Sequence, residues 1–268
     1  MEYDRIKPEE RQAGDDFECL YVTIDNVFYA ISDYRPGYGL VQYLGLRGNV
    51  EIPDEITWLE SFAFRDNSKV ERVIIPDSVD SIGIDVFRGC SNLREVIIEC
   101  SIDKIEEGMF SGCTSLESFE IPKGVKEIGV SAFRESGLKS IIIPDFVTIL
   151  GSHVFCRCRS LIKVMLPKFL SEIPESLFAG CSLEKLEVPH GVKRIGNEAF
   201  EFSDIKEIIL PDTLEEIGDD AFNCCFMLEK INIPESLTGV GDRAFSFCEK
   251  LPDHIQKHIT KINPNAFI

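Results

Sequence analysis

The 268-residue sequence has few basic side chains for its acids, with 28 Lys and Arg against 46 Asp and Glu and a net charge of −18. Nucleic acids and anionic membranes are bound through positive charge, so this balance argues against both as partners. No apolar run approaches the ~18–20 residues that cross a bilayer, so membrane insertion is not expected. Tryptophan occurs once and histidine four times, whereas 19 Phe and 10 Cys are unusually many. We therefore examine the positions of phenylalanine and cysteine for a repeating pattern.

The first residues have no apolar segment behind a basic one, which a secretory signal requires. Residues 1–18 carry mostly acids among their charges, and we expect a mobile acidic tail there. Ten cysteines without a signal fit a reducing compartment, so the sequence predicts a cytoplasmic protein. The alternative is a secreted or cell-surface protein, if a signal peptide precedes this sequence.

A repeat of 22 or 23 residues runs through the chain and accounts for ten of the phenylalanines. A second column holds proline in eight copies, with Glu99 in register at the place of a ninth. Such a period, with an L-x-x-I-x-I element in each copy, is typical of leucine-rich repeats. The phenylalanine column is Phe64, Phe87, Phe110, Phe133, Phe155, Phe178, Phe200, Phe222, Phe245 and Phe267.

Each copy alternates apolar and polar residues over a short run, which predicts a strand that the following proline ends. Six copies then carry glycine at a bend, where we expect a conformation that favours glycine. The Ala-Phe pair that follows predicts a helical turn or short helix on the back. One coil cannot bury its own apolar side, but a stack of coils can. The predicted fold is an α/β repeat solenoid: a right-handed leucine-rich-repeat superhelix of about ten coils with parallel β-strands and an N-terminal β-cap.

The phrases IPDSVDSIGIDVFRGCSNL and IPKGVKEIGVSAF strongly resemble the BspA-like (Treponema pallidum-type) leucine-rich-repeat family, over residues 52–268. The resemblance implies a protein-binding scaffold without catalytic residues or cofactor. It also implies an alternative, a bacterial surface or secreted adhesin that binds host proteins. We divide the chain into an acidic tail (1–18), an N-terminal β-hairpin cap (19–51), nine full repeats (52–252) and a truncated C-terminal capping repeat (253–268).

Cysteine and histidine offer little chemistry in this pattern. Six cysteines share one repeat column whose other occupants are Asn or Ser, so we interpret them as a buried structural ladder. They fall in adjacent-coil pairs (90/113, 158/181 and 225/248), so disulfides remain possible in an exported protein. His254 and His258 have metal-binding spacing but lack the Glu of a metalloprotease motif, and a solvated helix is the simpler interpretation. The sequence predicts neither a metal site nor an enzyme.

The predicted binding surface is the solvent side of the strand column, at the third and fifth positions of each L-x-x-I-x-I. Large apolar residues fill five of eight fifth positions, and an exposed apolar strip marks a contact surface; β-propensity alone could also select them. The mixed charges of the third column suit a protein partner of unknown identity. The acidity offers another alternative, an immunity- or inhibitor-type protein that neutralises a basic partner. The fifth positions are Ile74, Ile97, Glu120, Ile142, Met165, Glu187, Ile209 and Asn232; the third are Arg72, Glu95, Ser118, Ser140, Lys163, Lys185, Glu207 and Lys230.

Overall fold

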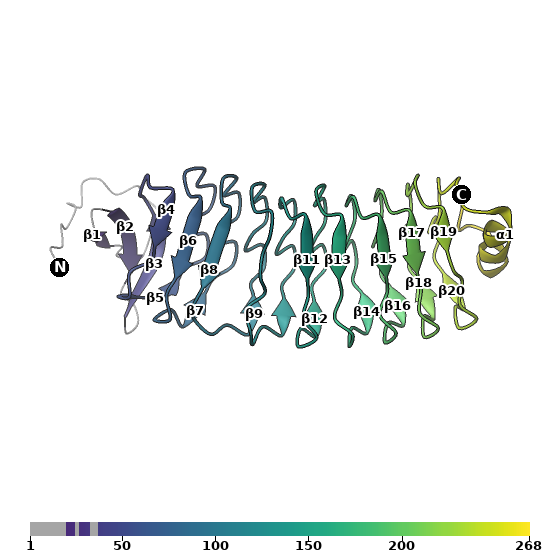
Figure 1. Cartoon of the computed structure of the whole chain (residues 1–268), viewed down its shortest axis with the longest axis horizontal. Helices are drawn as coiled ribbons and strands as arrows, with labels where there is room; N and C mark the ends of the chain where they lie inside the picture. Colours follow the sequence, from purple (N-terminus) through teal and green to yellow (C-terminus); the bar gives the residue numbers. More distant parts are fainter. Residues whose placement is uncertain (1–19, 25–26, 33–36) are drawn as a thin grey trace.

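The computed structural model describes residues 20–24, 27–32 and 37–268, and the expected acidic tail lies outside these residues. The described chain is an elongated stack of coils, with short parallel strands on two sides of each coil and turns on the third (Figure 1). The predicted repeat solenoid is confirmed. The first strand side, which we call the strand-lined face, consists of β4 (Asn49–Glu51), β6 (Arg72–Ile75), β8 (Glu95–Ile98), β11 (Ser140–Ile142), β13 (Lys163–Met165), β15 (Lys185–Glu187), β17 (Glu207–Ile209) and β19 (Lys230–Ile231).

The second strand side precedes the turns in each coil. Its strands are short because a bend follows them at once. They are β5 (Ile56–Leu59), β7 (Ser81–Ile82), β9 (Lys104–Ile105), β10 (Glu127–Ile128), β12 (Ile149–Leu150), β14 (Glu172–Ile173), β16 (Arg194–Ile195), β18 (Glu216–Ile217) and β20 (Gly239–Val240). These strands form three parallel ladders, β5–β7, β9–β10–β12 and β14–β16–β18–β20.

The two ends of the stack have different structures (Figure 1). At the N-terminal end, β1 (Leu20–Ile24) and β2 (Val27–Ser32) form an antiparallel pair, and β3 (Tyr38–Tyr43) joins β2 antiparallel and β5 parallel. At the C-terminal end, the helix α1 (Asp253–Ile262) takes the place of a strand and buries Ile259. Phe267 then returns to the phenylalanine column.

The phenylalanine column is the centre of the core. Neighbouring rings lie 5.0 to 5.9 Å apart from Phe64 to Phe267. The rings from Phe64 to Phe245 are at most 1% exposed. Aromatic pairs at this distance add to the free energy that burial of their apolar area already provides. The column therefore sets both the coil length and the spacing of the stack.

The third side differs from the expected short helix, because it consists of turns with two left-handed residues per coil. In the coil of Phe64, these residues are Phe62 (φ 70°) and Asp66 (φ 57°). Left-handed residues interrupt a right-handed helix. The backbone N–H groups of residues 62, 64 and 66 instead donate to the carbonyls of residues 84, 86 and 88 in the next coil, at 2.7 to 3.0 Å. The same pattern recurs along the stack, so the turns form a third hydrogen-bonded ladder.

Glycine is required at the bends because neighbouring coils pack closely there. Gly83, Gly129, Gly151, Gly196, Gly218 and Gly241 are all absent from the residues with positive φ. A Cβ at Gly83 would lie 2.4 Å from the backbone nitrogen of Ser61 in the preceding coil, and a Cβ at Gly241 would lie 2.3 Å from that of Asp219. The conformational reason expected from the sequence is therefore wrong at this bend: a side chain would separate the coils.

Candidate functional site

The strand-lined face turns the predicted third and fifth positions outward and, in most coils, buries the position between them. In β11, Ser140 and Ile142 are exposed and Ile141 is buried, and β15 repeats this pattern. Among the apolar fifth positions, Ile142 is 64% exposed, Met165 55% and Ile209 38%, while Ile74 and Ile97 are half-buried. The predicted residues thus lie on one face and point toward solvent.

The apolar fifth positions do not form one continuous strip. Ile74 pairs with Ile97 in the β6–β8 ladder, and Ile142 pairs with Met165 in the β11–β13 ladder. Glu120 stands between these two pairs. Glu187 lies between Met165 and Ile209 in this column, and Glu187 pairs with Ile209 in the β15–β17 ladder. At the far end, Asn232 hydrogen-bonds the backbone of Leu210 through its side-chain amide.

Ion pairs between neighbouring coils order the charged third positions. The Arg72 Nε lies 2.6 Å from a Glu95 carboxylate oxygen, and the Lys185 Nζ lies 2.6 Å from Glu207. Lys230 approaches the other oxygen of Glu207 at 3.8 Å. The hydrogen bond from Lys185 lowers the pKa of Glu207. Because these pairs are exposed, they orient side chains more than they stabilise the fold.

The sheet of this face is interrupted after β8, where one coil has no strand, and again between β13 and β15. Its ladders are β4–β6–β8, β11–β13 and β15–β17–β19, and residues 118–121 form no strand. At the inward position of this coil stands Phe119, where β6 has Val73 and β11 has Ile141. The Phe119 ring packs 4.9 Å from Phe110 and 5.3 Å from Phe133. We attribute the break after β8 to this ring, which takes more room than the branched aliphatic side chains of the column.

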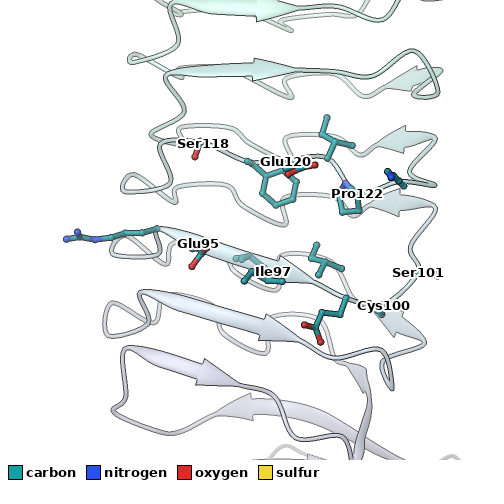
Figure 2. Close-up of a pocket in the computed structure, with 14 residues that line it drawn as sticks. Glu95, Ile97, Cys100, Ser101, Ser118, Glu120 and Pro122 are labelled. Carbon is teal, nitrogen blue, oxygen red and sulfur yellow. The ribbon is translucent and has the colours of Figure 1, made fainter.

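A cleft of about 820 Å³ fills the interruption, between β8 and residues 118–123. Figure 2 shows Glu95 and Ile97 on the strand β8, facing Ser118, Glu120 and Pro122 on the strandless segment. The remaining lining residues include the inward-facing Val96, Ile98 and Phe119. The cleft was missed at the sequence level, although a phenylalanine in a column of Val, Ile and Leu was the available signal.

The cysteine column is a structural ladder, as interpreted from the sequence. Each of its six thiols donates to the carbonyl of the column phenylalanine one coil back, as Cys90 does to Phe64 at 2.9 Å. Burial raises the pKa of Cys90 to about 12 and that of Cys158 to about 11. All nine cysteines in the described residues are free thiols, so the bridges considered for an exported protein are not formed. Protonated buried thiols are poor nucleophiles.

The described residues contain no group of three His, Cys, Asp or Glu side chains that could hold a metal ion. His254 and His258 are exposed on α1. On the turn side, a second hollow of about 730 Å³ was also missed at the sequence level. It places Arg134, Arg157 and Arg159 near Glu198 and Glu201, and burial together with Glu198 raises the pKa of Glu201. No helix of the described chain is long and apolar enough to cross a membrane.

Comparisons with solved structures show the same architecture. A leucine-rich repeat protein from Bacteroides ovatus is 23% identical, with a TM-score of 0.60 over 90% of this chain and 81% of that one. A leucine-rich repeat protein from Eubacterium ventriosum is 21% identical, with a TM-score of 0.60 over 88% of this chain and 69% of that one. At this identity the likeness is one of fold. A search of curated proteins gives no significant match.

The family comparison covers most of the sequence. Residues 46–162 and 171–268 match the family described as BspA type leucine rich repeat region, in six copies. The matched ranges include every strand of the strand-lined face except β13. The chain belongs to the BspA-type leucine-rich repeat family.

Proposed function

We propose that the protein is a non-catalytic scaffold that binds a partner protein on its strand-lined face. The observation that carries this proposal is the exposure of large apolar side chains on two paired strands: Ile142 is 64% exposed and its neighbour Met165 is 55% exposed. Exposed apolar patches rimmed by polar residues are typical of protein interfaces. Leucine-rich repeats are commonly used for protein interactions, which agrees with this function.

The third-position charges form the rim of this interface. Lys163 and Lys185 are exposed beside the apolar pair, and Glu207 is held in place by Lys185. Charged rim residues contribute more to orientation and association rate than to affinity. We propose that these three side chains fix the register of the partner, while Ile142 and Met165 supply most of the binding free energy.

The test is partner capture by the double variant Ile142→Asp with Met165→Asp. Two charges in the centre of the contact should remove the captured partner, because burying an unpaired carboxylate is costly. The matched control is Ile149→Asp with Val130→Asp. Ile149 and Val130 are 53% and 41% exposed; Ile149 lies in β12 on the second strand side, and Val130 begins the turn after β10.

Capture from the native lysate, followed by mass spectrometry, should show a protein that binds the wild type and the control but not the double variant. Circular dichroism should confirm that both variants are folded. If the folded double variant captures the same proteins as the wild type, the strand-lined face is not the interface.

A further inference from the structure

The cleft leaves backbone hydrogen-bonding groups of β8 without partners. Glu95 in β8 and Glu99 directly after it bond back to the preceding coil: Glu95 N–H donates to Glu71 and Glu99 N–H donates to Ile75, at 3.2 and 2.9 Å. Backbone groups alternate direction along a strand, so the N–H and C=O of Val96 and Ile98 point the other way, into the cleft. In the described chain, no ladder joins β8 to residues 118–121. An unpaired strand edge is a template for another strand.

The cleft also opens the core beneath this edge. The inward residues of the neighbouring coils are closed to solvent: Val73 is 0% exposed and Ile141 3%. At the cleft, by contrast, Val96, Ile98 and Phe119 are only half-buried. Apolar side chains that entered here would be buried against three core residues, which is favourable at about 25 cal/mol per Å² of apolar area.

The middle of the cleft is acidic, whereas Arg94 before β8 and Lys123 after residues 118–121 place basic side chains at its ends. In β8 and residues 118–121, the charged side chains are Glu95 and Glu120. Glu95 is paired with Arg72 on the side away from the cleft. Glu120 makes no ion pair with the described residues and is exposed. An inserted strand would place its outward side chains beside these two carboxylates, so basic residues are favoured there.

We propose that the cleft binds an extended segment of a protein partner, with alternating apolar and basic residues, which adds as a strand along the free edge of β8. Its backbone hydrogen-bonds Val96 and Ile98, its apolar side chains cover Val96, Ile98 and Phe119, and its basic side chains lie beside Glu120. In strand addition of this kind, backbone hydrogen bonds provide the affinity, and contacts of alternate side chains provide the specificity. The inference rests on the proposed function, since it names the part of the partner that enters the face.

A labelled peptide provides the test. The probe is a fluorescein-labelled heptapeptide of alternating Lys and Val, titrated with the full chain and followed by fluorescence anisotropy. We expect saturable binding below about 1 mM, a Kd at least about tenfold weaker for Glu120→Lys, and no detectable binding of the corresponding Glu-Val peptide. The control Glu172→Lys makes the same charge change at an exposed residue of the second strand side, in β14, and should alter the Kd less than about twofold.

Backbone methylation separates strand addition from charge attraction. N-methyl groups on the alternate peptide nitrogens that face β8 remove the donors of the ladder and should weaken binding by about tenfold or more. The proposal is overturned if the Lys-Val peptide does not bind at about 1 mM. It is also overturned if Glu172→Lys weakens binding as much as Glu120→Lys, or if methylation leaves the Kd unchanged at both sets of alternate nitrogens.

The outcome can be separated from that of the proposed function. If the peptide fails to bind while Ile142→Asp with Met165→Asp still abolishes partner capture, only the strand-addition proposal falls. If the peptide binds and capture is unaffected by that double variant, the cleft binds peptides but the apolar pair is not the interface.

Discussion

The ring of Phe119 lies 4.9 Å from the ring of Phe110, at an interplanar angle of 49°, and the strand-lined face is interrupted in the same coil. The phenylalanine column itself is continuous there, since Phe110 and Phe133 are 5.3 Å apart. The stack is therefore intact on its turn side and open on its strand side. One extra ring in the core is enough to account for this difference.

We expect Phe119→Val to close the cleft. Valine fits the inward column, as Val73 and Val96 show, so residues 118–121 can pair with β8. Amide hydrogen exchange at Val96 and Ile98, measured by NMR, should slow by about tenfold or more. Phe169→Val, at a side chain 73% exposed, is the control and should leave exchange at these amides unchanged. Unchanged exchange in Phe119→Val would show that another residue causes the break.

Truncation of the phenylalanine column should be costly in the middle of the stack. Phe133 and Phe155 are fully buried, and each has rings of the column on both sides. Either change to Ala should lower the free energy of unfolding by about 3–5 kcal/mol, measured by urea denaturation. The exposed Phe169→Ala should stay within about 0.5 kcal/mol of the wild type. A loss below about 1 kcal/mol at Phe133 would contradict the packing described for the column.

The buried thiols should make the protein sensitive to alkali. Below pH 9 the Cys90 thiol is protonated in both states, but between pH 9 and about 12 it ionises in the unfolded chain alone, because burial raises its pKa in the fold. Each such thiol therefore favours unfolding as the pH rises, by about 1.4 kcal/mol at pH 10. Cys90→Ser removes one of these groups, and serine occupies the same column at Ser136 and Ser203. From pH 8 to pH 10 the variant should lose about 1 kcal/mol less stability than the wild type; equal losses would place the Cys90 pKa near its ordinary value.

We expect a thiol titration to show that the cysteines are reduced. The nine cysteines of the described residues are buried, so Ellman's reagent should react with them slowly in the native protein. In denaturant and without reductant, all ten thiols of the sequence should react. Preparations that give six fewer would contain the three adjacent-coil disulfides instead.

The repeat made most of the fold predictable. Because each coil packs on a copy of itself, the positions of Phe133, Pro144 and Ile142 in one copy also fix what each of them contacts in the next. The inward and outward positions of the strand-lined face follow from the same alternation. These features depend on pattern alone, and the structure agrees with them.

Other features depend on the size of one side chain or on backbone geometry that composition does not reveal. The left-handed turn positions hold residues as different as Asp66, Glu135 and Phe202, so no residue type indicates the turn. We attribute the cleft to Phe119, whose size matters only once the neighbouring rings are in place. The partner-binding role of the exposed apolar pair Ile142 and Met165 stays a prediction, because exposure alone does not identify an interface.

The ladder of the turn side gives the whole stack an electrical direction. Its N–H groups, from residue 62 to residue 245, all donate toward the C-terminal coil, and the matching carbonyls all point back. Peptide dipoles that alternate in a β-sheet are therefore aligned along this side, as they are in an α-helix. Their positive pole lies at the end that carries α1, so the two ends of this strongly acidic protein differ in potential independently of their side chains.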